Sequence, residues 1–322
     1  MLQLVQVRCM KLFIILGNDC NLQCIYCCQR QIKERQIPRI IKPKFWEYFH
    51  SIPAGTHVVF FGGEPLLYFG AIKEIMSHRS DLQYGIITNG KLLDKDTVEW
   101  LNKYNVSVTV SWDGPISQYT RGYDVLKENP NIKDIDTLGV SAVLTKWTVV
   151  HEVVERVSEL LPNKEFGLHF DFPLNFTDEG LEFENVDTKK LYEDMRVYTN
   201  KFIHDDATPV EQSLVYSVIC ELIGKPHYGN KCGNGTTTIN IDLEGNLYNC
   251  HSESKPSEYS EEWDKTIKRQ RGMCEKCDML PFCGGGCSLM SDKSTLRRCD
   301  IVRAYYGGVI DTLYKNYGGA LC

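Results

Sequence analysis

The sequence lacks long apolar runs, an excess of positive charge and low-complexity tracts. Leu12–Leu16 is only strand-length, far short of the about 20 apolar residues that a membrane-spanning helix needs. The amino terminus lacks the charged, apolar and small-residue succession of a secretory signal. The formal net charge is −6, whereas nucleic-acid enzymes usually carry a basic surface. We therefore expect a cytoplasmic protein that binds neither membrane nor nucleic acid.

Cysteine, in contrast, is abundant, with fourteen residues. Disulfides are disfavoured in a reducing compartment, which leaves metal ligation, redox chemistry or buried thiols. Four cysteines lie within Cys20–Cys28 and seven within Cys232–Cys299. Such clustering indicates polynuclear metal sites better than scattered core packing.

The first part of the chain, which we assign to residues 1–175, alternates short apolar runs with amphipathic stretches. Six strand–helix repeats predict a parallel sheet with right-handed crossovers, an α/β fold of the partial (β/α)6 TIM-like barrel type. The predicted strands are Leu12–Leu16, His57–Phe61, Tyr84–Thr88, Val106–Ser111, Leu138–Leu144 and Phe166–Phe172. The predicted helices include Pro43–His50, Ala71–His78, Asp94–Tyr104 and Thr148–Leu161.

The rest of the chain divides into a helical bridge, residues 176–230, and a C-terminal Cys-rich domain, residues 231–322. The domain has few long periodic segments and no large apolar core, so bound clusters are expected to stabilise it. Glu244-Gly245-Asn246 predicts a hairpin turn. The remaining predicted elements are the bridge helices Lys189–Phe202 and Glu211–Ile223 and the hairpin strands Thr236–Leu243 and Leu247–Cys250.

The first cysteine group follows the first predicted strand. Cys20, Cys24 and Cys27 form a Cys-x3-Cys-x2-Cys loop with Tyr26 before the last cysteine. Three thiolates on one short loop can hold three irons of a cubane and leave the fourth iron open. A zinc site or buried structural thiols are the alternatives, although zinc would want a fourth ligand nearby. Cys28 is expected to be a neighbouring thiol and not a ligand.

Three polar motifs end the next three strands. They are Gly62-Gly63-Glu64-Pro65, Thr88-Asn89-Gly90 and Ser111-Trp112-Asp113-Gly114-Pro115. Glycines allow close approach of the backbone to a ligand, and Glu64 can accept a hydrogen bond from a cationic amine. A polar strand-to-loop turn is the alternative interpretation of each motif. Because the carboxyl ends of parallel strands meet at one edge, the motifs are expected to join the cysteine loop there.

The cysteine loop and these motifs together resemble the radical S-adenosylmethionine (SAM) superfamily. The resemblance implies a [4Fe-4S] cluster that binds SAM at its open iron and cleaves it to a hydrogen-abstracting 5′-deoxyadenosyl radical. Relatives often carry a His-Asp pair and then an arginine after Asp-Gly-Pro; here Arg121 comes sooner, as a candidate partner of the SAM carboxylate. The residues implied to line the SAM site are Tyr26, Gly62, Gly63, Glu64, Thr88, Asn89, Ser111, Asp113 and Arg121.

The C-terminal cysteines resemble the SPASM domain, which binds two auxiliary [4Fe-4S] clusters. The resemblance assigns the distal cluster to Cys274, Cys277, Cys283 and Cys299. It assigns the cluster nearer the barrel to Cys232, Cys250 and Cys287. A ribbon-type zinc domain is the alternative.

The proximal auxiliary cluster has only three cysteines in this pattern. Sulfatase-maturating relatives have a fourth cysteine where Thr238 stands here. Either a substrate thiolate meets an open iron, or Cys220 closes the site, since it falls off the apolar face of its predicted helix.

The resemblance implies a peptide maturase that installs a crosslink or similar oxidative modification on a ribosomally synthesised peptide. Anaerobic sulfatase maturation, small-molecule dehydrogenation and electron carriage are the alternatives. His251 replaces an aspartate of the sulfatase-maturating relatives, which counts against the first of these; its alternative role is beside cluster sulfur.

The implied partners are a flavodoxin- or ferredoxin-type electron donor and a peptide or protein substrate. Ten residues precede the first strand, leaving no room for the N-terminal leader-binding module of many maturases. We therefore expect recognition by the barrel mouth, the bridge or a separate leader-peptide-binding protein. The basic run Lys265–Arg271 is a candidate contact for an acidic leader, or simply a solvated face.

Overall fold

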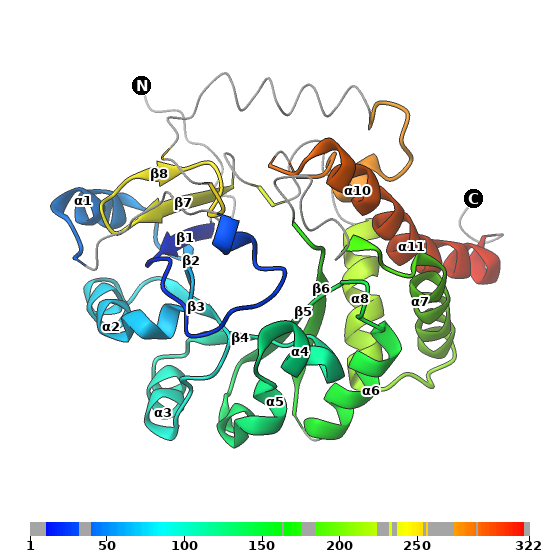
Figure 1. The fold of residues 1–322 in the computed structure, drawn as a ribbon, viewed down its shortest axis with the longest axis horizontal. Helices are drawn as coiled ribbons and strands as arrows, with labels where there is room; N and C mark the ends of the chain where they lie inside the picture. Colours follow the sequence, from blue (N-terminus) through cyan, green and yellow to red (C-terminus); the bar gives the residue numbers. More distant parts are fainter. Residues whose placement is uncertain are drawn as a thin grey trace.

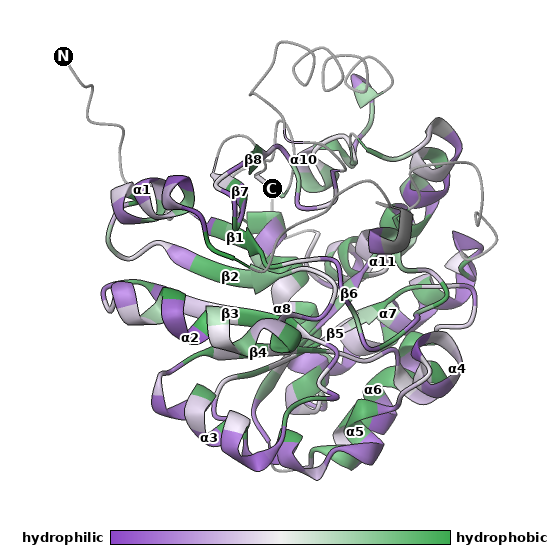
Figure 2. Cartoon of the chain, turned by 60° about the vertical axis from the view of Figure 1, so that its left-hand side comes forward, coloured by the Kyte–Doolittle hydropathy of each residue, from purple (hydrophilic) through white to green (hydrophobic). Residues whose placement is uncertain are grey.

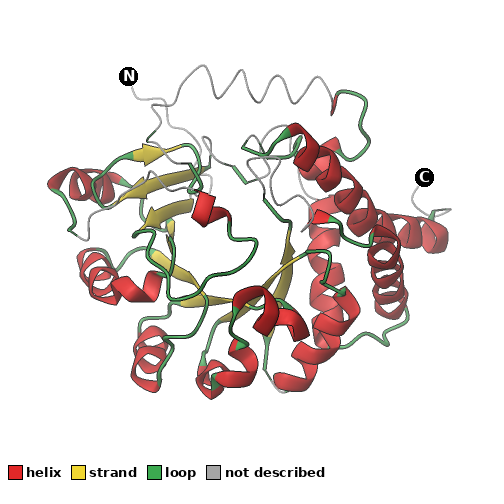
Figure 3. Ribbon diagram, in the orientation of Figure 1, coloured by secondary structure: helices red, strands yellow, loops and turns green. Residues whose placement is uncertain are grey.

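One curved, open sheet organises the protein, for which a computed structural model describes residues 11–31, 40–162, 164–174, 184–223, 232–233, 237–253, 256, 274–287 and 289–318. Its eight strands lie in the order β6-β5-β4-β3-β2-β1-β7-β8. Helices stand around the outside of the arc of strands (Figure 1), and Figure 3 shows the same arrangement with strands and helices in separate colours. This is the mixed α/β barrel-like architecture that the strand–helix alternation predicts.

The six predicted strands are confirmed to within one residue at each end. All neighbouring pairs from β1 to β6 are parallel. The strands are β1 Lys11–Ile15, β2 His57–Phe61, β3 Gln83–Thr88, β4 Ser107–Ser111, β5 Leu138–Val143 and β6 Phe166–Asp171.

The predicted helices are also present, and the signals that predicted their starts act locally. Asp94 caps α3 by accepting a hydrogen bond from the Thr97 amide at 2.8 Å, and Pro43 opens α1. They are α1 Pro43–Ser51, α2 Phe69–His78, α3 Lys95–Lys103, α6 Val150–Leu160, α7 Thr188–Ile203 and α8 Pro209–Ile223. Short helices without a predicted counterpart are α4 Ser117–Arg121, α5 Val125–Glu128, α10 Leu280–Cys283 and the 3-10 turns η1 Cys28–Gln31, η2 Pro65–Tyr68, η3 Gly114–Ile116 and η4 Pro130–Asp134.

The two faces of the sheet differ in chemistry. Alternate residues such as Leu12, Phe60 and Val110 are fully buried with the helices in one core, and Figure 2 shows strands and adjoining helix faces coloured as hydrophobic. The residues between them point to the concave face, which on β4 carries Ser107 and Ser111. Packing against helices therefore holds the barrel together, while its inner face is polar on β4 and apolar on β1 and β2.

The predicted hairpin is confirmed as β7, Thr238–Asp242, and β8, Leu247–Tyr248, which pair antiparallel. The sequence predicts it within the Cys-rich region, residues 231–322. In the structure β7 pairs in parallel with β1, from Lys11 opposite Thr238 to Ile15 opposite Asp242. The hairpin thereby covers a sheet edge that would otherwise expose backbone groups, and it carries Cys250 toward the barrel.

Helix α11, Asp292–Tyr317, contradicts the prediction that the Cys-rich region has few long periodic segments. It packs along α7 (Figure 1), where a Cβ on Gly308 would lie 2.5 Å from the Tyr192 carbonyl oxygen and 2.8 Å from the Met195 Cβ. Glycine is required for this close approach, and it also weakens the helix signal in the sequence. Neither α11 nor any other helix in the described ranges is both long and apolar enough to cross a membrane.

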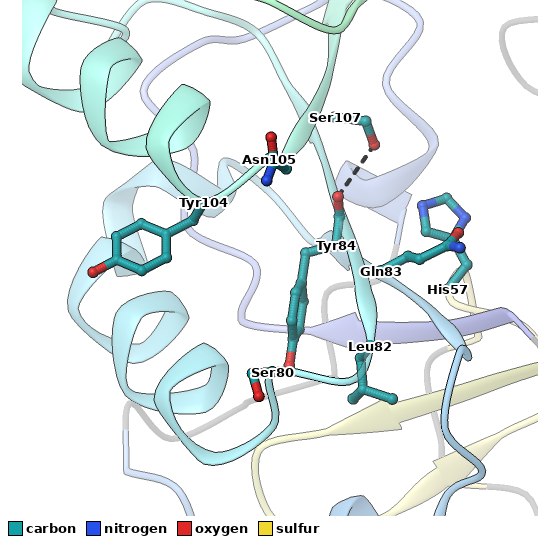
Figure 4. A pocket seen from close by; sticks show the side chains of 8 residues that line it. All are labelled: His57, Ser80, Leu82, Gln83, Tyr84, Tyr104, Asn105 and Ser107. Atoms are coloured by element: carbon teal, nitrogen blue, oxygen red, sulfur yellow. Dashed lines mark hydrogen bonds between the residues drawn. The ribbon is translucent and has the colours of Figure 1, made fainter.

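A cavity of about 350 Å³ opens at the amino ends of β2, β3 and β4 (Figure 4). Ser107 from β4 bonds to the Tyr84 carbonyl at 3.3 Å along its wall. The predicted site motifs lie at the other ends of these strands. Functional sites of such sheets form at the carboxyl ends, so we do not assign this cavity to the candidate site. Its lining consists of His57, Ser80, Leu82, Gln83, Tyr84, Tyr104, Asn105 and Ser107.

Candidate functional site

The first cysteine group lies on the loop after β1, at the carboxyl edge of the sheet. The Ile25 amide donates to the Thr120 carbonyl at 2.9 Å, which ties the loop to α4. Burial raises the pKa of Cys24 to about 11, against the charge of Arg121, and the charges of Cys27 and Cys20 raise it further. The three thiols therefore form one electrostatically coupled group. A thiol with a raised pKa, as in Cys24, stays protonated without a metal and loses its proton when it binds one.

The Gly62-Gly63 pair brings the loop after β2 against the loop after β1. A Cβ on Gly62 would lie 2.4 Å from the Gly17 carbonyl oxygen, and one on Gly63 would lie 2.3 Å from that of Asp19. The Gly63 amide donates to Gly17 and the Glu64 amide to Asp19, both at 2.8 Å. In the structure these glycines allow two protein backbones to meet, which fixes the path of the chain into Cys20.

Glu64 joins the ends of β2 and β3 from a fully buried position. Its carboxylate accepts hydrogen bonds from the Thr88 hydroxyl at 2.7 Å, the Asn89 amide at 2.8 Å and the Leu66 amide at 3.0 Å. Burial raises the pKa of Glu64, while these three bonds favour the charged form. Three of roughly four acceptor positions are filled, which leaves one on Oε2.

Asn89 continues this network to the cysteine loop. Its side-chain amide donates to Asn21 Oδ1 at 2.7 Å and approaches the Cys20 sulfur at 3.8 Å. The Glu64 carboxylate also raises the pKa of Cys20, after burial as the main cause. The second, third and first strand ends thus meet through Glu64, Asn89 and Cys20, as the motif positions predict.

Asp113 holds the other side of the cysteine loop. Its buried carboxylate accepts hydrogen bonds from Tyr26, from Thr120 at 2.7 Å, from Arg121 at 2.8 Å and from the Val143 amide at 3.1 Å. These protein donors occupy both oxygens, so the carboxylate positions Tyr26 and Arg121. A direct contact of Asp113 with SAM stays a prediction.

Arg121 is buried beside the cysteine loop, with its guanidinium 5.5 Å from the centre of the Tyr26 ring. One nitrogen pairs with Asp113 at 2.8 Å, whereas Nε makes no hydrogen bond within the described part of the chain. A buried guanidinium N–H without an acceptor among the described residues is costly and leaves room for a further acceptor at this position. The arginine is therefore placed to meet an anionic ligand group next to the three thiols.

The concave face beside this site is polar. Ser141 on β5 donates to Asp171 on β6 at 2.6 Å, and His169 Nε2 lies 3.6 Å from the same carboxylate oxygen. Desolvation would raise the pKa of Asp171, although its side chain is 60% exposed, but the contacts with His169 and Ser141 and the charge of His169 outweigh it and lower the pKa. Ser111, the predicted site residue on β4, stands opposite Ser141 on this face.

The distal C-terminal cysteines come together around α10 and the start of α11. Burial raises the pKa of Cys299, and the charges of Cys283, Cys274 and Cys277 raise it further. Arg303 of α11 donates to the Cys277 sulfur at 3.2 Å. The four residues assigned to the distal cluster by resemblance thus form one group with a cationic neighbour.

Cys232, Cys250 and Cys287 form a second C-terminal group. Burial raises the pKa of Cys250, followed by the charges of Cys287 and Cys232. The Ser252 amide donates to the Cys250 sulfur at 3.4 Å. Thr238, where sulfatase-maturating relatives have a cysteine, donates its hydroxyl to the Cys232 carbonyl at 2.8 Å.

Cys28 lies between the barrel loop and this second group, which the sequence did not predict. The Ser252 hydroxyl hydrogen-bonds to Cys28, and Gln29 Nε2 lies 3.2 Å from the same hydroxyl. Burial raises the pKa of Cys28 to about 12, with the charges of Cys27 and Cys287 acting in the same direction. Cys28 and Ser252 lie 224 positions apart in the sequence, so local patterns do not predict their contact. The adjacent cysteines Cys27 and Cys28 are the one sequence signal that a second thiol has a role here.

The other candidates are placed differently. Cys220 is exposed on α8, where its thiol bonds to Tyr216, one turn earlier. His251 packs on the rings of Phe13 and Phe61, at centroid distances of 5.0 and 4.3 Å. The basic run Lys265–Arg271 lies outside the described residues. Among the described residues, no three His, Cys, Asp or Glu side chains converge on a single metal ion.

Part of the chain matches a known protein family. Residues 14–127 match the model of the Radical SAM superfamily. The radical SAM cyclopropyl synthase TigE of Paramaledivibacter caminithermalis is 30% identical over 154 residues, 37% of this chain and 33% of TigE. An uncharacterized protein of Methanocaldococcus jannaschii is 28% identical over 145 residues, 43% of this chain and 49% of that protein. The chain thus spans a third to a half of these relatives.

Two solved structures share the fold over most of the chain. Native anSMEcpe with bound AdoMet and Cp18Cys peptide has a TM-score of 0.73 at 18% identity, covering 96% of this chain and 99% of that one. Streptococcus suis SuiB bound to its precursor peptide SuiA has a TM-score of 0.60 at 19% identity, covering 87% and 72%. Residues 14–127 therefore carry a radical SAM domain, whose cysteine loop lies at the carboxyl edge of the sheet.

Proposed function

We propose that the protein is a radical SAM peptide maturase that oxidatively modifies or crosslinks a peptide side chain. The observation that carries the proposal is the coupled group of Cys20, Cys24 and Cys27 beside Glu64 and Arg121. Three thiols of one loop fit three irons of a [4Fe-4S] cluster. When bound, this cluster supplies the reductive cleavage of SAM, for which a flavodoxin- or ferredoxin-type protein would deliver the electron.

Two residues beside the thiols would orient SAM. The open acceptor position of Glu64 suits a cationic amino group, and the unpaired Nε–H of Arg121 suits a carboxylate. Glu64 and Asn89 on one side and Asp113 with Tyr26 on the other would hold the cysteine loop in place. Thr88, Gly62, Gly63 and Ser111 complete the proposed SAM site.

Two auxiliary [4Fe-4S] clusters would stabilise the C-terminal part and carry electrons. Backbone amides and Arg303 donate to cysteine sulfurs in both groups, an environment that tunes cluster potentials. The proposed ligands of the distal cluster are Cys274, Cys277, Cys283 and Cys299. The proposed cysteine ligands of the proximal cluster include Cys232, Cys250 and Cys287.

A peptide is the substrate class that we propose for the concave face. The two structural neighbours hold peptides, Cp18Cys and SuiA, and the polar group of Ser141, His169 and Asp171 can bond to a peptide backbone or polar side chain. Small molecules such as sugars are the competing class. The substrate would pass between this face and the auxiliary clusters.

A deuterium-transfer experiment tests the proposal. The reconstituted enzyme is incubated anaerobically with SAM, a reductant and the short Cys- or aromatic-rich peptide encoded nearest its gene, deuterated at those side chains. Deuterium should appear in 5′-deoxyadenosine, and the peptide should lose two hydrogen atoms. A matched reaction with deuterated sugars is the control. Transfer from the sugars and not from the peptide would contradict the peptide proposal.

A further inference from the structure

The proximal auxiliary group has three cysteines in its motif, whereas the structure brings a fourth thiol to it. Cys28 begins η1, immediately after the last cysteine of the first group. Its thiol shares the Ser252 hydroxyl with Gln29, and the Ser252 backbone amide in turn donates to the Cys250 sulfur at 3.4 Å. The charge of Cys287 also acts on Cys28. Cys28 is therefore linked through Ser252 to Cys250, and it lies within electrostatic range of Cys287.

Adjacent cysteines serve different groups because of local geometry. Successive side chains at the start of a 3-10 turn diverge by about 120°, so Cys27 and Cys28 cannot face the same point. The Cys27 charge acts on its neighbour Cys28 and also on Cys24 and Cys20, which belong to the first group. Cys28 turns instead toward Ser252, which is buried in the turn after β8.

The other two candidates for the fourth ligand, Thr238 and Cys220, make different contacts. The Thr238 hydroxyl bonds to the Cys232 carbonyl, and Cys220 is exposed on α8 beside Tyr216. Neither contact points to the thiol of Cys250.

We propose that Cys28 is the fourth ligand of the proximal auxiliary cluster, completing a set with Cys232, Cys250 and Cys287. On binding, an iron–sulfur bond forms, the Cys28 thiol proton passes to solvent and no electron is transferred. The radical SAM loop and the C-terminal region would then share a cluster, since one ligand comes from the barrel and three from the Cys-rich region. This inference rests on the proposed auxiliary clusters.

The test uses the full chain with Cys20, Cys24 and Cys27 replaced by Ala, so that only auxiliary clusters bind iron. Three single substitutions are introduced into this background. Cys28→Ser tests the proposed ligand, and Cys220→Ser is the matched control. Cys250→Ser removes a ligand that the auxiliary-cluster proposal already includes. Iron and sulfide per chain and the EPR spectrum of the reduced protein are measured with and without added 2-mercaptoethanol.

The parent and Cys220→Ser should hold about eight irons in two clusters, with EPR signals that the thiol does not change. Cys28→Ser should fall toward about four, or keep a cluster whose signal shifts with the thiol because one iron is open. A Cys28→Ser protein that matches the parent in both measurements overturns the assignment, as does a thiol-induced shift in the parent. If Cys250→Ser also keeps all its iron, the auxiliary-cluster proposal itself fails.

Alkylation of the native reconstituted wild-type protein keeps the inference testable should Cys28→Ser fold poorly. Iodoacetamide should modify the exposed Cys220 and spare Cys28 and Cys250, as mass spectrometry of the peptides would show. Modification of Cys28 while Cys250 is spared would overturn the ligand assignment.

Discussion

Glu64 connects the ends of β2 and β3 through its buried carboxylate, and Asn89 extends this network to the loop after β1. Glu64→Ala removes an acceptor for the Thr88 hydroxyl and the Asn89 amide and, by our proposal, for the SAM amine. The loss of one charge-assisted hydrogen bond costs about 1.5–3 kcal/mol, so SAM affinity should fall about 10- to 150-fold with iron content unchanged. Calorimetric titration with SAM measures this, with Glu99→Ala on the exposed face of α3 as control. Unchanged affinity would leave Glu64 a purely structural role.

The His169–Asp171 pair gives a prediction about pH. Asp171, through its hydrogen bond and then its charge, raises the pKa of His169 above 6.5, and His169 helps to lower the pKa of Asp171 below 3.8. The stability from the pair is therefore full between pH 3.8 and 6.5, and is lost as the pH rises through the pKa of His169 or falls through that of Asp171. Both side chains are more than half exposed, so the effect should stay below about 1 kcal/mol.

Asp171→Asn isolates this term because an asparagine oxygen still accepts from Ser141. Its melting temperature, measured anaerobically, should fall below that of wild type at pH 6, and the difference should shrink at pH 9. An equal deficit at both pH values would show that charge pairing with His169 does not stabilise the fold.

At the scale of elements, the contact of α7 with α11 depends on Gly308, the second of two adjacent glycines on α11. In Gly308→Ala the new methyl group meets the Tyr192 carbonyl and Met195, so the helices must separate, at a cost of about 1–3 kcal/mol. Gly307→Ala is the matched control, since its Cβ would lie 3.6 Å from the Tyr192 ring and helix propensity gains up to about 1 kcal/mol. Thermal unfolding of the two variants should move in opposite directions; equal destabilisation would contradict the close packing.

At the scale of the whole molecule, ten of the fourteen cysteines are assigned to three groups. Replacing Cys20, Cys24 and Cys27 by Ala should abolish 5′-deoxyadenosine formation from SAM while the auxiliary absorbance remains. Iron should fall from about twelve to about eight per chain. Chromatography of the reaction and iron analysis measure both. Reductive SAM cleavage by the triple variant would refute the assignment of the catalytic loop, and stoichiometric zinc would refute the cluster proposal.

The sequence alone determined the local features of this protein. Short apolar runs and amphipathic stretches located six strands and six helices, and the Asp94 cap marked the start of α3. The cysteine spacing and the Gly-Gly-Glu-Pro motif pointed to the radical SAM resemblance. These signals are readable because hydrogen bonds and side-chain alternation act between residues close in sequence.

Only the tertiary structure decided which distant surfaces meet. The pairing of β7 with β1, the packing of α11 on α7 and the contact of Cys28 with Ser252 each join segments far apart in the chain. The sequence motif predicts that Gly62 and Gly63 make room for a ligand. In the structure they make room for the backbone of Gly17 and Asp19. Local sequence determines which residues form each helix or strand. Which distant segment packs against it depends on the packing of the whole chain.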